Sequence, residues 1–177
     1  VYQMLLIILP LITAPYIART LGAEGVGIYS YTYSVAQYFL LFAMLGISNH
    51  GNRSIAAVRE DDCKLSRTFW SIYSIQAFMY VLAIIAYLIY LFAFNVDNKT
   101  IVAIQFIYVV SGALDISWYF FGTEQFKITV TRNMIIKIAT VILMFIFVHN
   151  PGDLAKYTVI MAGGTFLSQA YLWTYIF

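Results

Sequence analysis

The chain has 177 residues, of which 62% are hydrophobic and only 10% are charged, and its mean hydropathy is +0.82. Ordinary soluble domains carry about 25% charged residues, so this composition excludes a typical soluble fold and favours a protein embedded in a lipid bilayer. The formal net charge of +2 is too small to indicate a nucleic-acid partner.

Six apolar segments are each close to the length that a membrane-spanning helix requires. About 20 apolar residues cross about 30 Å of hydrocarbon as a helix, and a helix satisfies its backbone hydrogen bonds internally. The expected spans are residues 1–17, 27–47, 69–94, 101–121, 133–148 and 154–177. The sequence therefore predicts an all-α, polytopic membrane helix bundle of about six transmembrane helices, in which short connectors make neighbouring helices antiparallel.

The first two spans are joined by a short connector with the sequence LGAEG. Pro10 and Pro15 interrupt the apolar run before it, and prolines bend or end helices. The glycine-rich stretch is not a phosphate-binding loop, because no Lys-Ser/Thr pair follows it and no strand precedes it. We therefore expect a tight turn between two spanning helices.

The cations of the connectors are distributed unevenly, which predicts the orientation of the chain. Seven flank the second and fourth connectors and three lie in the others: Arg53, Arg59, Lys64, Arg67, Lys127, Arg132 and Lys137 against Arg19, Lys99 and Lys156. Cytoplasmic connectors carry an excess of Lys and Arg. The second and fourth connectors are therefore expected on the cytoplasmic side, and the longer second one, residues 48–67, is expected as a charged exit from the membrane.

The spans differ in polarity. The third span has few polar side chains besides Ser71, Ser74 and Gln76, so we expect it to face lipid. The fourth and second carry polar stripes at helical spacing, which predicts that these faces look inward. The stripes are Gln105, Tyr108, Gly112, Asp115 and Tyr119 in the fourth span, and Ser30, Tyr33, Ser34 and Gln37 in the second. A stripe of this kind serves as packing surface or as transport pathway, and both interpretations stay open.

Small residues in the last span predict close packing between helices. Gly163, Gly164 and Ser168 lie on this span, and small side chains allow two helix backbones to approach each other in a membrane.

Asp115 is the first candidate for a functional residue. It lies about six residues, roughly 9 Å, from the cytoplasmic end of its span, and a central membrane charge costs about 2.5 to 3.5 kcal/mol on insertion scales. One interpretation is a structural contact, either a helix cap or an ion pair with Arg19, Arg53 or Lys137. The other is a proton or sodium site, or a gate that opens during transport.

Arg53 and Arg19 are the next candidates, because each lies at the end of a span. Such an arginine either orients the helix or binds a ligand, and its planar guanidinium matches phosphate oxygens bidentately. Glu124 and Lys127, in the sequence GTEQFK, are either solvated loop charges or part of the entrance to a binding site.

Catalytic and metal-binding patterns are not found in the sequence. His50 and His149 are isolated, and the acidic run Glu60, Asp61 and Asp62 lacks the second acidic cluster of a magnesium-diphosphate site. A single cysteine, Cys63, excludes an internal disulfide framework. We therefore expect no cofactor, no metal and no enzymatic activity.

Two sequence blocks carry a resemblance to a known family. They are PLITAPYIARTLGAEGVGIYSYTYSVAQYFLLFAMLGISNHGNRSIAAVRED and LDISWYFFGTEQFKI. Both closely resemble the N-terminal half of bacterial polysaccharide flippases, the Wzx-type exporters of the multidrug/oligosaccharidyl-lipid/polysaccharide exporter superfamily. The resemblance covers essentially the whole chain. It implies that residues 1–177 form one N-terminal lobe, a fragment of a longer two-lobe transporter.

The resemblance also implies a function and a location. Members of this family move undecaprenyl-diphosphate-linked repeat units across the cytoplasmic (inner) membrane for capsule, O-antigen or exopolysaccharide assembly. The implied partners are the lipid-linked oligosaccharide, membrane lipid and the polysaccharide polymerase machinery. Contacts with substrate are expected at Arg19, Arg53, Asp115, Glu124, Lys127 and Gln37. The alternatives are a cation-coupled multidrug exporter of the same superfamily and, less favoured because paired catalytic carboxylates are absent, a membrane-embedded transferase.

Overall fold

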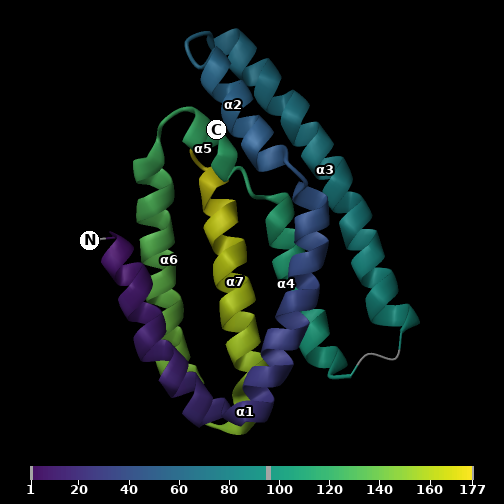
Figure 1. Cartoon of the computed structure of the whole chain (residues 1–177), viewed down its shortest axis with the longest axis vertical. Coiled ribbons are helices and arrows are strands. Elements are labelled where there is room, and N and C mark those ends of the chain that lie inside the picture. Colours follow the sequence, from purple (N-terminus) through teal and green to yellow (C-terminus); the bar gives the residue numbers. More distant parts are fainter. Residues whose placement is uncertain (1, 95–96, 177) are drawn as a thin grey trace.

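The computed structural model describes residues 2–94 and 97–176, with side chains from residue 8 onward, and the described residues form helices and no strand. In chain order the elements are α1 (Tyr2–Met44), α2 (Ile47–Val58), α3 (Asp62–Ala93), α4 (Lys99–Ala113), α5 (Ser117–Gly122), α6 (Phe126–Phe147), the 3-10 helix η1 (Pro151–Asp153) and α7 (Leu154–Trp173). Figure 1 shows them as one elongated bundle. The predicted all-α membrane helix bundle is confirmed.

Three helical segments of the described chain are long and apolar enough to cross a membrane: Asp62–Ala93, Lys99–Gly122 and Phe126–Phe147. One face of α3 is exposed, which agrees with the prediction that it faces lipid, and the other face is buried in the bundle. Large apolar side chains lie on the exposed face, among them Phe78, Leu82, Ile85, Ile89 and Phe92. Such a face is stable against hydrocarbon and unstable in water.

The first two predicted spans form the single helical element α1, which folds back on itself at a kink (Figure 1). Within α1, Gly22 is the residue with non-helical backbone angles, φ 72° and ψ 174°. Positive φ is easily accessible to glycine because it has no Cβ. The predicted connector is therefore reduced to one residue. Pro10 and Pro15 lie inside the helical limb that precedes it.

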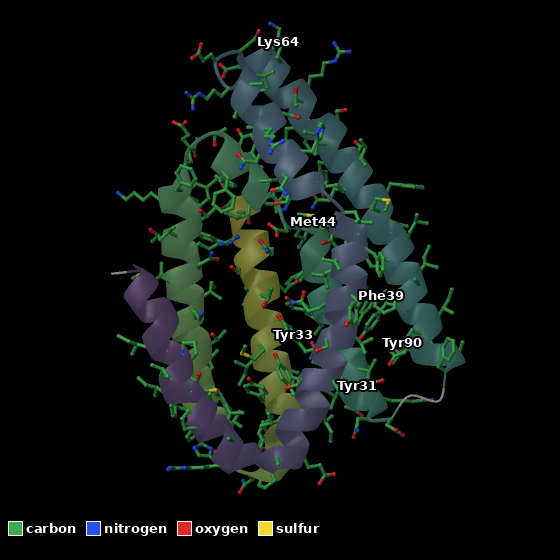
Figure 2. All side chains as sticks on the ribbon, viewed as in Figure 1. Tyr31, Tyr33, Phe39, Met44, Lys64 and Tyr90 are labelled. Atoms are coloured by element: carbon green, nitrogen blue, oxygen red, sulfur yellow. The ribbon has the colours of Figure 1, made fainter. Side chains whose placement is uncertain are left out.

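The second limb of α1 packs along α3. Phe39 of α1 contacts Tyr87 and Tyr90 of α3, with ring centroids 5.2 and 6.1 Å apart, and Figure 2 shows Phe39 and Tyr90 between the two ribbons. Ala36, Tyr87, Val102 and Val109 form a buried cluster that extends this contact to α4.

The second connector is more ordered than the sequence indicated. Residues 47–58 form helix α2, and α3 begins at Asp62, seven residues before the predicted start of the third span at residue 69. Asp61 caps α3 by accepting a hydrogen bond from the backbone N–H of Lys64 at 3.1 Å. The hydrogen bond from the Lys64 side chain lowers the pKa of Asp61. The hydropathy pattern missed α2 and the first seven residues of α3 because many of their residues are polar.

Helix α2 is held against α5 by close contacts at glycines. A Cβ on Gly51 would lie 2.7 Å from the Trp118 ring, and one on Gly122 would lie 2.6 Å from Ile55. These residues border a buried cluster that joins α2, α3, α5 and α7: Ile55, Phe69, Ile72, Ile116, Trp118, Phe120 and Leu172. The polar exit predicted from sequence is therefore a packed cap on one end of the bundle, with Lys64 near its tip (Figure 2).

The connectors separate between the two ends of the bundle as the cation count requires. Helices α2 and α5 lie at one end, and the kink of α1 and the connector before α7 lie at the other (Figure 1). At this second end the Tyr16 hydroxyl donates to the Val148 carbonyl at 2.6 Å. The prediction that the second and fourth connectors are on the cytoplasmic side remains a prediction.

The turn before α7 is organised by one carboxylate. Asp153 accepts hydrogen bonds from the backbone N–H groups of His149 and Asn150 at 3.0 and 3.1 Å, and it pairs with Lys156 at 2.7 Å. The contact with Lys156 and these two N–H groups lower the pKa of Asp153 to about 2.

The prediction of close packing at the glycines of the last span is confirmed for one glycine and wrong for its neighbour. A Cβ on Gly164 would collide with Cγ2 of Thr140 on α6, whereas one on Gly163 would meet nothing within 4 Å. Gly164 therefore sets the distance between α6 and α7, and Gly163 does not.

Gly164→Ala is expected to destabilise the full-length protein by about 1–3 kcal/mol, because the added methyl group forces α6 and α7 apart. Gly163→Ala, one residue away, is the matched control and should melt at or slightly above the wild-type temperature. Thermal melting in detergent measures both. Equal melting temperatures for the two variants would contradict the close contact.

Candidate functional site

The fourth predicted span is broken, and the break is the centre of the polar site. Helix α4 ends at Ala113 and α5 begins at Ser117, whereas the sequence predicted a continuous helix over residues 101–121. A break in a membrane-embedded helix frees backbone carbonyls that need partners inside the protein. Three successive carbonyls at this break receive side-chain donors.

Two side chains from other helices supply these donors. Nε2 of Gln76 on α3 lies 2.8 Å from the Asp115 carbonyl and 3.4 Å from the Ala113 carbonyl. The indole Nε1 of Trp173, at the end of α7, donates to the Leu114 carbonyl at 3.1 Å. Helices α3 and α7 therefore stabilise the break from two sides.

Gln76 is itself fixed by a further hydrogen bond. Its Oε1 accepts from the indole Nε1 of Trp118 on α5 at 2.8 Å, and both side chains are fully buried. The sequence analysis gave Gln76 no role, because it assigned α3 to lipid as a whole. The position of Gln76 along the helix could have indicated that it is buried. It belongs to one helical stripe with the other buried residues of α3: Phe69, Ile72, Tyr80, Ala83 and Tyr87.

Asp115 lies in the break, half-buried. Its Oδ1 accepts a hydrogen bond from the backbone N–H of Ser117 at 2.9 Å, so the carboxylate caps the first turn of α5. In the described part of the chain, no ion pair joins Asp115 to Arg19, Arg53 or Lys137. Of the two structural contacts considered from sequence, the structure therefore shows a cap on backbone and no ion pair with these cations.

The polar stripes of the second and fourth predicted spans contact each other. Nε2 of Gln37 donates to the hydroxyls of Tyr33 and Tyr108 at 2.6 and 2.7 Å, and the two hydroxyls are 2.9 Å apart. Tyr29 extends the group toward α7 through an edge contact with Tyr157, with centroids 4.8 Å apart. The expectation that these faces look inward is right for Tyr33, Gln37 and Tyr108, which form a polar contact between α1 and α4. It is wrong for Ser30 and Ser34, which are exposed.

The charges at the α2 end include one ion pair between elements. Arg59, the residue directly after α2, pairs with Glu124, which has a left-handed backbone in the α5–α6 loop. Both side chains are substantially exposed, at 41% and 65%, and exposed pairs contribute only about 0–1 kcal/mol. Arg53 and Lys127 are exposed as well, and within the described residues neither has an ion pair.

The six candidate residues therefore occupy three levels of the bundle. Arg53, Glu124 and Lys127 belong to the α2 and α5–α6 end, with Asp115 at the adjacent break. Gln37 lies on the second limb of α1, and Arg19 lies three residues before the kink at the opposite end (Figure 1). The structure brings Glu124 to Arg59 and leaves Arg53 and Arg19 far apart along the bundle.

Arg132 was assigned only to a connector and is a residue that sequence reasoning missed. Its side chain is 5% exposed and donates to the Ser168 carbonyl, to Gln169 and to Asn133. The error came from placing the start of the fifth span at residue 133, whereas α6 begins at Phe126. Among the described residues, no group of three His, Cys, Asp or Glu side chains could hold a metal ion.

Gln76→Leu is expected to destabilise the full-length protein by about 1–3 kcal/mol, because it leaves the Trp118 N–H and the Asp115 carbonyl buried without this partner. Gln125→Leu, the same substitution at an exposed position, should change stability by less than about 0.5 kcal/mol. Thermal melting in detergent separates the two. A Gln76→Leu protein that melts with the control would show that the break does not depend on Gln76.

Comparison with known proteins gives one family over the whole chain. A family model described as "Polysaccharide biosynthesis protein" matches residues 1–177. The "Putative O-antigen transporter" of Escherichia coli (strain K12) is 28% identical over 154 residues, which cover 84% of this chain and 36% of the relative. The chain thus spans about a third of the length of this curated relative. No solved structure matches significantly.

Proposed function

The chain belongs to the polysaccharide biosynthesis protein family, and from this membership we propose that it is the N-terminal membrane lobe of a flippase for lipid-linked oligosaccharides. The proposed substrate is an undecaprenyl-diphosphate-linked repeat unit, moved across the inner membrane for capsule, O-antigen or exopolysaccharide assembly. The observation that carries the proposal is the family match over residues 1–177 of an all-α membrane bundle. The polymerase machinery is a proposed partner.

The arrangement of polar and apolar surfaces supports this proposal. A lipid-linked oligosaccharide keeps its tail in hydrocarbon while its sugars cross the membrane, so its carrier needs both kinds of surface. The outer face of α3 is apolar and exposed. The group of Gln37, Tyr33 and Tyr108 provides amide and phenol groups between α1 and α4. Such groups exchange hydrogen bonds readily with sugar hydroxyls.

Arg53 is the proposed contact for the diphosphate. It is exposed on α2, at the end of the bundle that the cation count assigns to the cytoplasm. Arg59 nearby pairs with Glu124, which offsets part of the negative charge at this end of the bundle. Lys127, exposed in the first turn of α6, adds positive charge at the same end. Arg19, at the opposite end, is the proposed contact on release.

The family match and the E. coli relative favour this function over a cation-coupled multidrug exporter. Transport across a membrane makes and breaks no covalent bond of the substrate, so this function needs no catalytic side chains. Asp115 is then a candidate for coupling or gating, since its half-buried carboxylate lies at a break in the helix that conformational change can use.

Arg53→Lys in the full-length protein tests diphosphate recognition. Lysine keeps the charge that orients the protein but loses the bidentate geometry, so the protein should insert normally while polysaccharide export falls about tenfold. Arg67→Lys, the same change at an exposed position early in α3, should export normally. Wild-type export by the Arg53→Lys protein would leave Arg53 with an orienting role alone.

Asp115→Asn tests whether the carboxylate charge is used in transport. The Asn Oδ1 still accepts the Ser117 N–H, so abundance and melting temperature should match the wild type, while export falls about tenfold or more. Ser117→Ala is the control, because the backbone N–H in the cap is kept. An abundant, stable and fully active Asp115→Asn protein would reject a role for the charge. If the melting temperature and export both fall, the role of Asp115 is structural.

A further inference from the structure

A small cavity of about 270 Å³ lies at the end of the bundle where α3 begins (Figure 1). Its lining includes three aromatic residues, Phe69 and Trp70 of α3 and Tyr119 of α5, and one carboxylate, Asp62 of α3. Sites that enclose a whole small molecule have volumes of about 300–1,000 Å³. This cavity is therefore suited to a small chemical group at the end of a larger molecule.

The aromatic residues of the cavity pack against one another. The ring centroid of Phe69 lies 5.3 Å from that of Trp70 and 5.2 Å from that of Tyr119, in edge contacts at 81° and 77°. Phe69 is buried and also stacks on Tyr73 and Trp118, with centroids 6.0 and 5.5 Å apart. Phe69 therefore supports the two outer rings, and Trp70 and Tyr119 are the rings available to a ligand.

Asp62 supplies the charge of the cavity. The described residues that line the cavity include no Lys or Arg, and in the part of the chain that the structure describes Asp62 has no ion pair. The adjacent Asp61, by contrast, pairs with Lys64. A carboxylate and the face of a Trp or Tyr ring both attract a cation. The cavity is therefore suited to an ammonium group and unsuited to an anion.

The exposed apolar face of α3 continues from this cavity along the helix. Trp70 is 45% exposed, and the exposed residues Phe78, Leu82, Ile85 and Ile89 follow it at helical spacing. An ammonium group in the cavity would thus lie at the head of a surface that hydrocarbon covers. This continuity favours a lipid over a water-soluble amine, with the headgroup in the cavity and the acyl chains along α3.

We propose that the cavity binds the headgroup of a phospholipid that carries a primary ammonium. The ammonium lies between the Asp62 carboxylate and the rings of Trp70 and Tyr119. Contacts between a cation and an aromatic ring are strongest with Trp and strengthen when the cation is desolvated, which a cavity at the membrane surface provides. This lipid site goes beyond the proposed flippase function and does not depend on it.

The test uses the full-length protein purified in a non-ionic detergent. Its melting temperature is followed against increasing phosphatidylethanolamine. A parallel series uses phosphatidylglycerol with the same acyl chains, which has the phosphate but no ammonium. We expect a saturable rise in melting temperature with phosphatidylethanolamine that phosphatidylglycerol does not reproduce. Equal rises in the two series, or no rise in either, would overturn the proposal.

Asp62→Asn removes the charge and keeps the size of the side chain. The apparent affinity for phosphatidylethanolamine should fall about fivefold, the upper value for an exposed ion pair. Glu60→Gln, an equal loss of charge at an exposed position outside this cavity, should bind like the wild type. A carboxylate in a first helical turn also stabilises the helix through its dipole. If that is the only role of Asp62, Asp62→Asn lowers the melting temperature equally in both lipids, which contradicts the proposal.

Trp70→Leu separates the headgroup from the acyl chains, because leucine keeps an apolar surface and removes the ring. Its apparent affinity should fall about two- to fivefold, as for the loss of one exposed cation–ring contact. Phe78→Leu, an exposed aromatic residue farther along the same face, is the matched control. Equal losses of affinity in the two variants would show that both rings contact acyl chains only, and would reject the ammonium site.

Export by the Arg53→Lys protein distinguishes a failure of this proposal from a failure of the proposed function. Absent selectivity for phosphatidylethanolamine together with reduced export by Arg53→Lys would remove the lipid site and leave the flippase function in place.

Discussion

The structure depends on the need to satisfy backbone polar groups where a membrane helix is interrupted. Each unsatisfied group in hydrocarbon costs several kcal/mol, and the break between α4 and α5 frees three successive carbonyls. Gln76 and Trp173 donate to them from α3 and α7, and the Asp115 carboxylate accepts from the N–H of Ser117. The break is therefore tied by hydrogen bonds to two other helices, α3 and α7.

This arrangement determines how α2 and α5 close one end of the bundle. The break redirects the chain so that Trp118 both donates to Gln76 and packs against Gly51. Gly122 then brings α5 close to Ile55 on α2. A larger residue at either glycine would push α2 away, and with it the exposed surface that carries Arg53. The position of the proposed diphosphate contact is thus set by packing several residues away from it.

The cations of the chain have different environments and therefore different chemistry. Arg59, directly after α2, pairs with Glu124, and Arg53 is exposed on α2. Arg132 is buried between α6 and α7 and donates hydrogen bonds to neutral oxygens. An exposed arginine recognises a ligand that arrives from solution or from the membrane surface, whereas a buried one needs a cavity.

The sequence by itself was enough to predict that the protein is embedded in a membrane, that its fold is all-α, and which family it belongs to. These follow from local quantities, namely apolar length, turn residues such as Gly22 and two contiguous sequence blocks. The contact between the polar faces of α1 and α4 was predicted in part, because helical spacing places Gln37 and Tyr108 on facing sides, whereas Ser30 and Ser34 of the same predicted stripe are exposed. Only the tertiary structure decided that Gln76 supports the break, that Asp115 caps α5, that Gly164 and not Gly163 touches α6, and that Arg132 is buried. Each of these depends on which residue of a distant helix lies opposite, and hydropathy along one segment contains no information about the partner that the segment meets.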